Sequence, residues 1–385
     1  MIARQEKCMS VAALCVFAVC VTLPAQQGKQ EKPGKSQQAS SKDGPIIVRP
    51  KGRRRSRSSS RAAVRRGLDW LARGQAEDGR WPSPNGIHDI ATTGLTMLAM
   101  LADGSTLREG RHAQALERGA AWLRDQQGEN GLIGTMAAST FMYCHAIGSW
   151  ALIECYGLSK LATLKRHGQL SVNYIQEARN PFKVWRYYPR DGQNDSSMTG
   201  WMVLALTAAK DHGLAVDKDA LRFAAAWYDQ VSDPTTRRVG YLRCGGRSSR
   251  EVGMVEKFPA DKTEALTALG LAACLRMGAV PDESPMLAVA ARTMLSKPPR
   301  WQADRIDYYY WFHGSHAVAS LGEPFLTIWR DSLEPALLQH QSKNDEEAGS
   351  WDPIGVWCKS GGRIYSTAMA VLSLRCFSPR NRLIR

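Results

Sequence analysis

The sequence predicts an all-α domain in which six helical hairpins close into a ring. Two kinds of helical segment alternate from about residue 62 onward, and the apolar kind recurs six times at spacings of 51 to 64 residues. Such a repeat indicates hairpins that bury a core by packing on their neighbours. An open solenoid is the alternative, but solenoids cap their end repeats with polar faces. The last repeat here, STAMAVLSLRC (366–376), is as apolar as the middle ones, which favours a closed ring.

The first 61 residues are predicted to lie outside this domain. Residues 1–25 place Arg4 and Lys7 before an apolar run, which is the pattern of a cleaved signal peptide; a retained membrane anchor is the alternative. Residues 26–61 are rich in Gln, Lys, Ser, Pro and Gly. They are predicted to form a disordered basic linker, because they cannot bury enough apolar surface to fold. The domain is predicted to span residues 62–380.

The positive charge of the chain is concentrated in its N-terminal tail. Residues 1–66 hold 15 Lys or Arg and 3 acidic residues, which accounts for +12 of the net charge of +15. A basic tail attracts anionic partners, so we expect it either to contact anionic polymers of the cell envelope or to serve as a solvated spacer. The signal peptide predicts export to the periplasm or cell envelope. Nucleic acid is therefore not an expected partner.

Four amphipathic segments are predicted to form outer helices. Their apolar residues recur at three- and four-residue steps, as a helix with one buried face requires. The segments are AAVRRGLDWLARGQ (62–75), ALERGAAWLRDQQ (115–127), ALRFAAAWYDQV (220–231) and LAVAARTMLSK (287–297).

Six segments that are apolar on every side are predicted to form inner helices, because a helix without a polar face must be buried all round. They are TTGLTMLAMLA (92–102), CHAIGSWALIECYG (144–157), MTGWMVLALTAA (198–209), KTEALTALGLAAC (262–274), SHAVASLG (315–322) and STAMAVLSLRC (366–376). Aligning them places one polar residue of each in a single column: Thr93, His145, Thr199, Thr263, His316 and Thr367.

A loop motif of glutamine, glycine and tryptophan recurs between the helices. It reads GQAEDGRWP at 74–82 and is echoed by DQQGENGLIG at 125–134 and EEAGSWDP at 346–353. Glycine supplies a turn conformation that other residues resist, and glutamine can bond backbone groups left free at a helix end. The tryptophan ring can pack on the next hairpin while its N–H finds a partner. We predict a structural clamp between repeats.

The recurring clamp resembles the QW motif of the prenyltransferase and squalene–hopene cyclase repeat superfamily. The resemblance covers residues 62–380, and DSSMTGWMVLAL, DYYYWFHGSHAV and GSWDP with GGRIYSTAMAVLSL look like segments of exported bacterial members of unknown activity. It implies an (α/α)6 toroid with a central funnel. It also implies a ligand of the isoprenoid class or another hydrophobic small molecule.

The motifs that define the chemistry of this superfamily are missing. The chain has neither the DxDD motif of the cyclases nor the Asp-x-Cys zinc pair of the protein prenyltransferases, and it lacks the Cys-Gly-Glu-Gln thioester of the complement-type toroids. The HxxH pair His313 and His316 is a weak metal signal. We therefore predict neither a metal nor another cofactor, and whether the chain is an enzyme stays open.

In the architecture that the resemblance implies, the N-terminal ends of the inner helices face the funnel. The candidate acids there are Asp195, Asp261 and Glu264, of which Glu264 interrupts an apolar helix and needs a partner or a raised pKa. Helix capping is the alternative for Asp195 and for Asp89.

Histidine and aromatic side chains are the candidate ligand contacts. They are His145 and His316, three repeats apart and therefore expected to face each other, together with Tyr308, Tyr309, Trp311 and Trp185. Aromatic faces stabilise cations or stack on sugars. Packing in the core is the alternative for each of them.

Three functions remain open. The first is a cyclase- or transferase-like enzyme acting on an isoprenoid. The second is a non-catalytic envelope protein that binds a ligand or partner. The third is a polysaccharide-acting toroid, which would need a pair of carboxylates that the sequence does not display.

Overall fold

The computed structural model describes residues 51–378, 381 and 383, with side chains from residue 59 onward. Over this range the chain forms twelve α-helices and two short 3₁₀ helices. The predicted signal peptide and residues 26–50 of the predicted linker lie outside the described residues. In the described part of the chain, no helix combines the length and the apolar character needed to cross a membrane.

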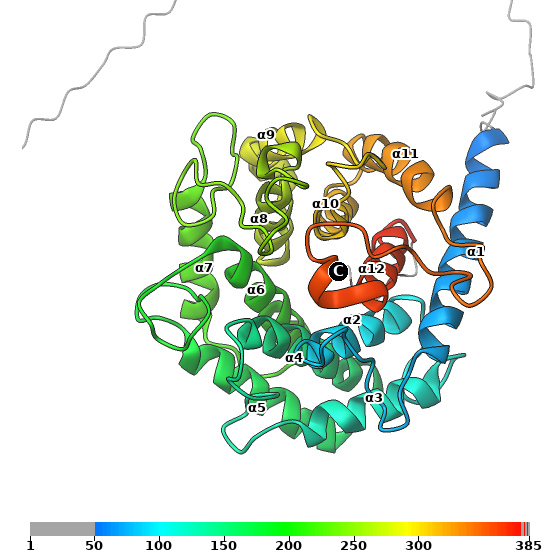
Figure 1. Cartoon of the computed structure of the whole chain (residues 1–385). Coiled ribbons are helices and arrows are strands. Elements are labelled where there is room, and N and C mark those ends of the chain that lie inside the picture. Colours follow the sequence, from blue (N-terminus) through cyan, green and yellow to red (C-terminus); the bar gives the residue numbers. More distant parts are fainter. Residues whose placement is uncertain (1–50, 379–380, 382, 384–385) are drawn as a thin grey trace, which may run out of the picture. The chain divides into compact units, whose positions relative to one another are not determined.

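The helices alternate between an inner and an outer ring (Figure 1). The inner helices are α2 (Asp89–Ala102), α4 (Phe141–Ser159), α6 (Ser196–Asp211), α8 (Ala265–Arg276), α10 (Tyr308–Leu321) and α12 (Cys358–Arg375). The outer helices are α1 (Lys51–Arg73), α3 (Ala113–Asp125), α5 (Ala162–Ala178), α7 (Lys218–Val231), α9 (Pro285–Leu295) and α11 (Phe325–Leu338). The predicted (α/α)6 toroid is confirmed. Helices α5 and α11 are the two outer helices that the sequence pattern did not reveal.

The ring closes between its first and last repeats, so the open solenoid is excluded. Arg375 at the end of α12 donates from Nε and Nη2 to Ala102 O at the end of α2, at 3.0 and 2.8 Å. On the outer ring, Ser60 Oγ of α1 donates to Glu334 Oε1 of α11 at 2.7 Å. An apolar last repeat is stable here because the first repeat covers it.

Helix α1 begins at Lys51, inside the stretch predicted to be a disordered linker. The prediction was wrong for residues 51–61. Ser60 is anchored against α11, and extending an anchored helix backwards costs little once it is nucleated. Arginine, which dominates this stretch, is also a good helix former.

The Gln-Gly loops clamp neighbouring outer helices, as predicted. Gln75 Nε2 donates to Gly79 O at 2.8 Å and to Ala115 O of α3 at 2.9 Å. Gln127 Nε2 bonds Gly131 O and His167 O of α5 in the same way, at 3.1 and 3.0 Å. Each glutamine therefore bonds one carbonyl in its own loop and one carbonyl of the next outer helix. It does not bond a free backbone group at the end of its own helix, as the sequence had suggested.

Gln341 makes the same clamp across the closure of the ring. Its Nε2 donates to Gly349 O at 2.7 Å and to Ala63 O of α1 at 2.8 Å. Trp351 then donates its indole N–H to Leu337 O of α11 at 2.8 Å. The last repeat thus grips the first with the contacts that join adjacent repeats.

Two threonines of the predicted polar column serve these clamps. Thr93 Oγ1 accepts the backbone N–H of Trp81 at 2.9 Å, and Thr367 Oγ1 accepts that of Trp351 at 3.1 Å. In the fourth repeat Thr267 takes this role, bonding Val239 N at 3.2 Å. The column was therefore misplaced by one helical turn at Thr263, which precedes α8.

Candidate functional site at the mouth of the inner ring

Asp195 is the most deeply buried of the three predicted acids. It is the N-cap of α6, and its Oδ1 accepts the backbone N–H of Met198 at 2.7 Å, which confirms the predicted cap. Its other oxygen, Oδ2, lies 3.4 Å from Tyr241 Oη and 3.7 Å from Arg186 Nε. The side chain is fully buried. One oxygen is thus structural, while the other faces a polar cluster.

Burial raises the pKa of Asp195 to about 7, although the N–H of Met198, the charge of Arg186 and the hydroxyl of Tyr241 each oppose the rise. An isolated carboxylate is costly in a dry site unless a cation pairs with it closely. The guanidinium of Arg186 stands too far away to compensate fully. At neutral pH both protonation states are therefore populated, which suits a carboxyl for general acid or base work.

Four tyrosines from separate elements surround this carboxyl. Tyr187 and Tyr241 share a hydrogen bond of 2.6 Å between their hydroxyls, and the ring of Tyr143 on α4 lies 6.3 Å from that of Tyr187. Tyr309 of α10 is hydrogen-bonded to Ser197 Oγ of α6 at 2.9 Å. We call these four residues, Tyr143, Tyr187, Tyr241 and Tyr309, the tyrosine cluster.

Three members of the tyrosine cluster, Tyr143, Tyr241 and Tyr309, stay protonated beside Asp195. Burial raises the pKa of Tyr143 well above its usual value, and the negative charge of Asp195 raises it further. Burial and then Asp195 also raise the pKa of Tyr241. The phenols can therefore donate hydrogen bonds to a ligand or to the ionised carboxyl.

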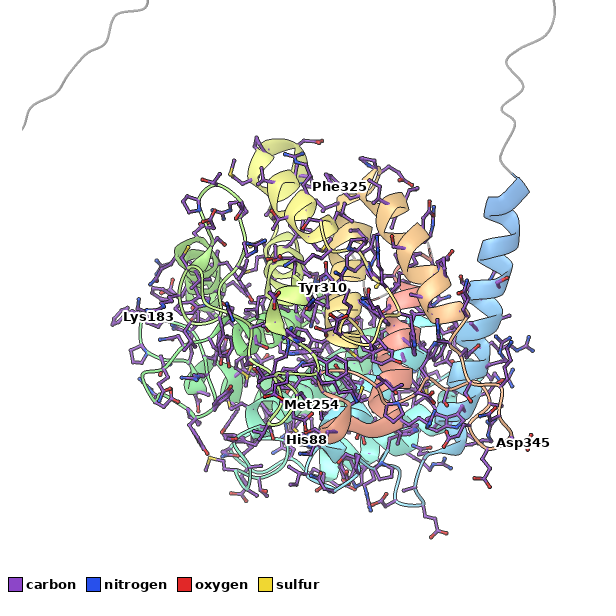
Figure 2. All side chains as sticks on the ribbon, turned by 45° about the horizontal axis from the view of Figure 1, so that its top comes forward. His88, Lys183, Met254, Tyr310, Phe325 and Asp345 are labelled. Atoms are coloured by element: carbon purple, nitrogen blue, oxygen red, sulfur yellow. The ribbon has the colours of Figure 1, made fainter. Side chains whose placement is uncertain are left out.

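A long connection between α7 and α8, residues 232–264, covers this mouth. Ser196 N and Oγ donate to Tyr241 O at 3.0 and 3.1 Å, which holds the start of the connection against α6. Farther along, Glu251 Oε1 accepts the hydroxyl of Ser360 on α12 at 2.6 Å. Met254, from the same connection, packs against the core (Figure 2). Asp195 therefore lies below a covering segment.

Aromatic side chains fill the centre of the ring below the mouth. Trp150 of α4 lies 6.4 Å from both Trp201 of α6 and Phe312 of α10, measured between ring centroids. Helices α4 and α10 stand on opposite sides of the inner ring (Figure 1), so these rings meet across its middle. Trp201 is six residues into α6 from Asp195, about 9 Å along the helix. The funnel implied by the resemblance is therefore closed at this depth.

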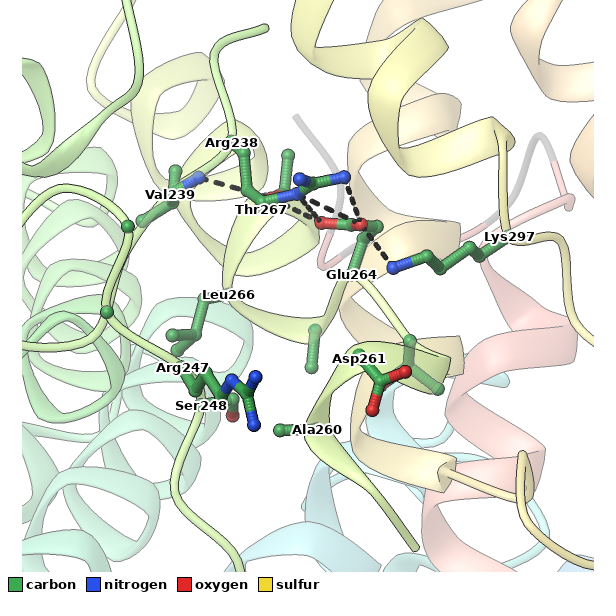
Figure 3. A pocket seen from close by; sticks show the side chains of 14 residues that line it. Arg238, Val239, Arg247, Ser248, Ala260, Asp261, Glu264, Leu266, Thr267 and Lys297 are labelled. Carbon is green, nitrogen blue, oxygen red and sulfur yellow. Dashed lines mark hydrogen bonds and ion pairs between the residues drawn. The ribbon is translucent and has the colours of Figure 1, made fainter.

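The predicted acid Glu264 does not join Asp195. It lies before α8 and is buried, and its carboxylate is bonded by Arg238 Nε at 3.1 and 3.0 Å and by Lys297 Nζ at 2.7 Å (Figure 3). The predicted partner of this buried carboxylate is thus a pair of cations. Asp261, on the 3₁₀ helix η1 (Ala260–Lys262), is exposed and lines the same pocket as Glu264.

His145 points away from the centre. Its Nδ1 accepts the backbone N–H of Ile133 at 3.0 Å, and its ring meets Tyr174 of the outer helix α5 at 4.8 Å. Burial lowers its pKa to about 3. The expectation that His145 and His316 face each other is therefore wrong, because His145, like Thr93 and Thr367, holds a clamp loop rather than lining the funnel.

His316 and His313 lie inside the ring instead. His316 stacks on Phe312 at 6.1 Å, and His313 meets Trp201 edge-on at 4.9 Å. Burial lowers the pKa of His316 to about 3 and that of His313 well below its usual value, so both are neutral. Among the described residues, no group of three or more His, Cys, Asp or Glu side chains is placed to hold a metal ion.

The remaining aromatic candidates are part of the packing. Trp185 donates its indole N–H to Ile175 O at 2.7 Å, the arrangement that Trp81 makes with Leu71 O at 2.6 Å. Tyr308 donates to Asp352 O at 3.0 Å, away from Asp195. Trp311 is buried, and its indole nitrogen has no hydrogen-bond partner among the described residues. Of the predicted aromatic contacts, Tyr309 belongs to the tyrosine cluster.

Sequence reasoning missed Tyr143 and Tyr241. Tyr143 precedes His145 by two positions, as Ser197 precedes Thr199 and Tyr365 precedes Thr367. Because the inner helices share one register, this position was a usable signal for side chains near the mouth. Tyr241 comes from an irregular connection, for which periodicity gives no signal.

The chain matches no family model and no curated protein. Among solved structures, the type II terpene cyclase MstE from Scytonema, in complex with merosterolic acid A, is 14% identical; the match covers 85% of this chain and 99% of that chain, with a TM-score of 0.55. Cellobiose 2-epimerase from Bacillus thermoamylovorans is 12% identical; the match covers 84% of this chain and 99% of that chain, with a TM-score of 0.57. An α-amylase from Clostridium perfringens is 10% identical; the match covers 82% of this chain and 98% of that chain, with a TM-score of 0.55.

At such identities the likeness shows the fold alone. The described domain is an α/α toroid of the kind that a terpene cyclase, an epimerase and an amylase share. A fold with such different chemistries does not define a reaction. The function must therefore be argued from the site.

Proposed function

We propose that this toroid binds an isoprenoid or another hydrophobic small molecule beside the tyrosine cluster, and that Asp195 transfers a proton to or from it. The carboxyl of Asp195 is the observation that carries the proposal. It is fully buried, its Oδ2 faces Tyr241 and Arg186, and its pKa of about 7 populates both protonation states at neutral pH.

The environment of the carboxyl also supports this class of ligand. Aromatic rings provide apolar contact area and can stabilise developing positive charge, while their hydroxyls orient a polar end of the ligand. A carboxyl with a pKa near 7 is a much weaker acid than protonation of an unactivated alkene demands. General acid–base transfer at a polar group of the ligand is the better match, and it agrees with the missing DxDD and zinc motifs.

The substitution Asp195→Asn separates proton transfer from structure. Asparagine caps a helix as well as aspartate does but cannot donate or accept the proton. We expect the full-length protein to bind geranylgeraniol with quenching of tryptophan fluorescence, because Trp201 lies below the site. If it turns over such a ligand, the rate should fall above pH 7 when Asp195 acts as the acid and below pH 7 when it acts as the base. In either case the rate should drop about 10²- to 10⁴-fold in Asp195→Asn.

Asp217→Asn is the matched control. Asp217 caps the outer helix α7 through Asp219 N at 2.9 Å and follows the opposite end of α6 from Asp195, so this variant should behave like the wild type. Mass spectrometry of extracted lipids measures turnover. A wild-type protein that binds no isoprenoid or hydrophobic alcohol contradicts the proposal.

Binding without turnover is the second candidate function. It is favoured by Trp150, Trp201 and Phe312, whose rings pack against one another at the centre of the ring, below Asp195. In that case the wild type and Asp195→Asn bind alike and neither forms product. The same assay therefore distinguishes the two functions.

Export to the periplasm or cell envelope is also part of the proposal. The signal-like residues 1–25 support it, and the basic charge of the N-terminal tail would hold the toroid near anionic envelope polymers. Sequencing the N-terminus of the mature protein tests it. A chain that still begins at Met1 in the cytosol contradicts it.

A further inference from the structure

A second pocket, of about 220 Å³, lies beside the start of α8. Residues from three segments line it: the connection between α7 and α8, the first turn of α8 and Lys297 after α9. Its ionisable side chains are Arg238, Arg247, Lys297, Asp261 and Glu264. Three cations against two carboxylates leave the lining with an excess of positive charge.

One side of the pocket is a fixed group of charges (Figure 3). Glu264 is 4% exposed, and Arg238 and Lys297 both bond its Oε1, from Nη2 at 2.9 Å and from Nζ at 2.7 Å. An arginine has five N–H donors and a lysine three. The carboxylate therefore holds both cations in place without using all their donors.

Arg247 adds a cation that no carboxylate neutralises. It follows the Gly245-Gly246 turn, it lines the pocket, and its side chain has no ion pair among the described residues. Figure 3 shows its guanidinium across the pocket from the Arg238–Glu264–Lys297 group. Arginine binds oxyanions in a bidentate geometry, and lysine binds them as a point charge.

The first turn of α8 forms another part of the wall. Ala265, Leu266 and Thr267 line the pocket, and the side chain of the N-cap residue Glu264 does not bond their N–H groups. The first N–H groups of a helix lack intrahelical partners and carry partial positive charge. These N–H groups thus add hydrogen-bond donors whose partial positive charge attracts an anion, as the three cations do.

We propose that this pocket binds a phosphate-type oxyanion, either free phosphate or the phosphate group of an ester. The observations that carry it are independent of Asp195 and the tyrosine cluster. Asp261 is exposed, so solvent screens its charge, and Asp261 and Glu264 together still leave the lining with one positive charge in excess.

Calorimetric titration of the full-length protein with inorganic phosphate, glycerol phosphate and acetate tests the proposal. We expect one phosphate-type ligand to bind saturably. If glycerol phosphate binds as well as inorganic phosphate, the pocket can accept the phosphate group of an ester. Arg247→Ala should weaken binding at least tenfold. Because Arg247 is exposed, this variant should fold normally.

Arg243→Ala is the control for this experiment. Arg243 is an exposed cation on the same connection but does not line the pocket, so its loss should leave the affinity unchanged. The proposal is overturned if the wild type shows no saturable binding of phosphate or its ester. Equal weakening by Arg243→Ala and Arg247→Ala, or binding of acetate in preference to phosphate, overturns it as well.

Discussion

Asp195 illustrates how one side chain serves structure and chemistry at once. Oδ1 caps α6 through Met198, while Oδ2 faces Tyr241 and Arg186 at distances too long for a strong ion pair. Glu264 is buried to a similar extent but has two close cations. Asp195 and Glu264 are therefore both buried, and they differ in the distance from the carboxylate to the nearest cation.

The stability of the protein should depend on pH through Asp195. Because its pKa is raised to about 7 in the folded state, the unfolded chain ionises first as pH rises, and the free energy of unfolding falls between about pH 4 and pH 7. Compared with Asp195→Asn, the wild type should lose about 4 kcal/mol of its free energy of unfolding by pH 8, because each pKa unit corresponds to 1.36 kcal/mol.

Urea unfolding of both proteins at a series of pH values measures this difference. Other groups titrate equally in the two proteins, so the difference isolates Asp195. Parallel pH curves would mean that the folded protein holds this carboxyl ionised, contrary to the pKa given by burial.

The element that builds the ring is the clamp loop rather than the helix alone. Gly79 has a φ of +99°, and a Cβ there would lie 2.5 Å from Arg118 O of the next outer helix α3. The loop can approach that helix only through a residue without a side chain. Gln75 then fixes the contact by bonding Ala115 O.

Gly79→Ala should destabilise the protein by about 2–4 kcal/mol, since it combines a left-handed backbone with a steric clash. Gly104→Ala is the matched control, because Gly104 has a φ of +104° but nothing within 4 Å of an added Cβ. That variant should lose only about 1 kcal/mol. Thermal unfolding measures both, and equal losses would show that the clash is relieved by movement of α3.

At the scale of the whole molecule, closure makes the last repeat equivalent to an internal one. Gln341 reaches Ala63, 278 residues away in the sequence, with the geometry that Gln127 uses toward His167. No hairpin is left with an unpaired apolar face. The ring should therefore unfold as one cooperative unit rather than fray from an end.

Gln341→Ala should then cost as much stability as Gln127→Ala, about 1–3 kcal/mol, because each leaves carbonyl groups without their donor. A single urea transition for each variant is the expected result. An early partial transition in Gln341→Ala alone would indicate that the closing contact is weaker than the internal ones.

The sequence alone determined the repeated helical hairpins, the all-α fold class and the loops that clamp the hairpins together. Apolar inner helices and the glutamine–glycine motif are local patterns, and each recurs often enough along the chain to identify the hairpins. The apolar last repeat also predicted closure. Helix α5 escaped notice because its buried face includes Gly168 and Ser171, which interrupt the apolar pattern, and α11 because it contains Pro335.

Only the tertiary structure decided which side chains meet. Asp195 was identified from its place before an inner helix, but the tyrosine cluster comes from four elements whose approach no sequence spacing encodes. His145 and Trp185 were predicted to contact a ligand, yet His145 accepts the backbone N–H of Ile133 and Trp185, in the loop between α5 and α6, donates to Ile175 O. For His145 the reason is that a helix turns by about 100° per position. A shift of one residue therefore separates the centre of the ring from its outer wall.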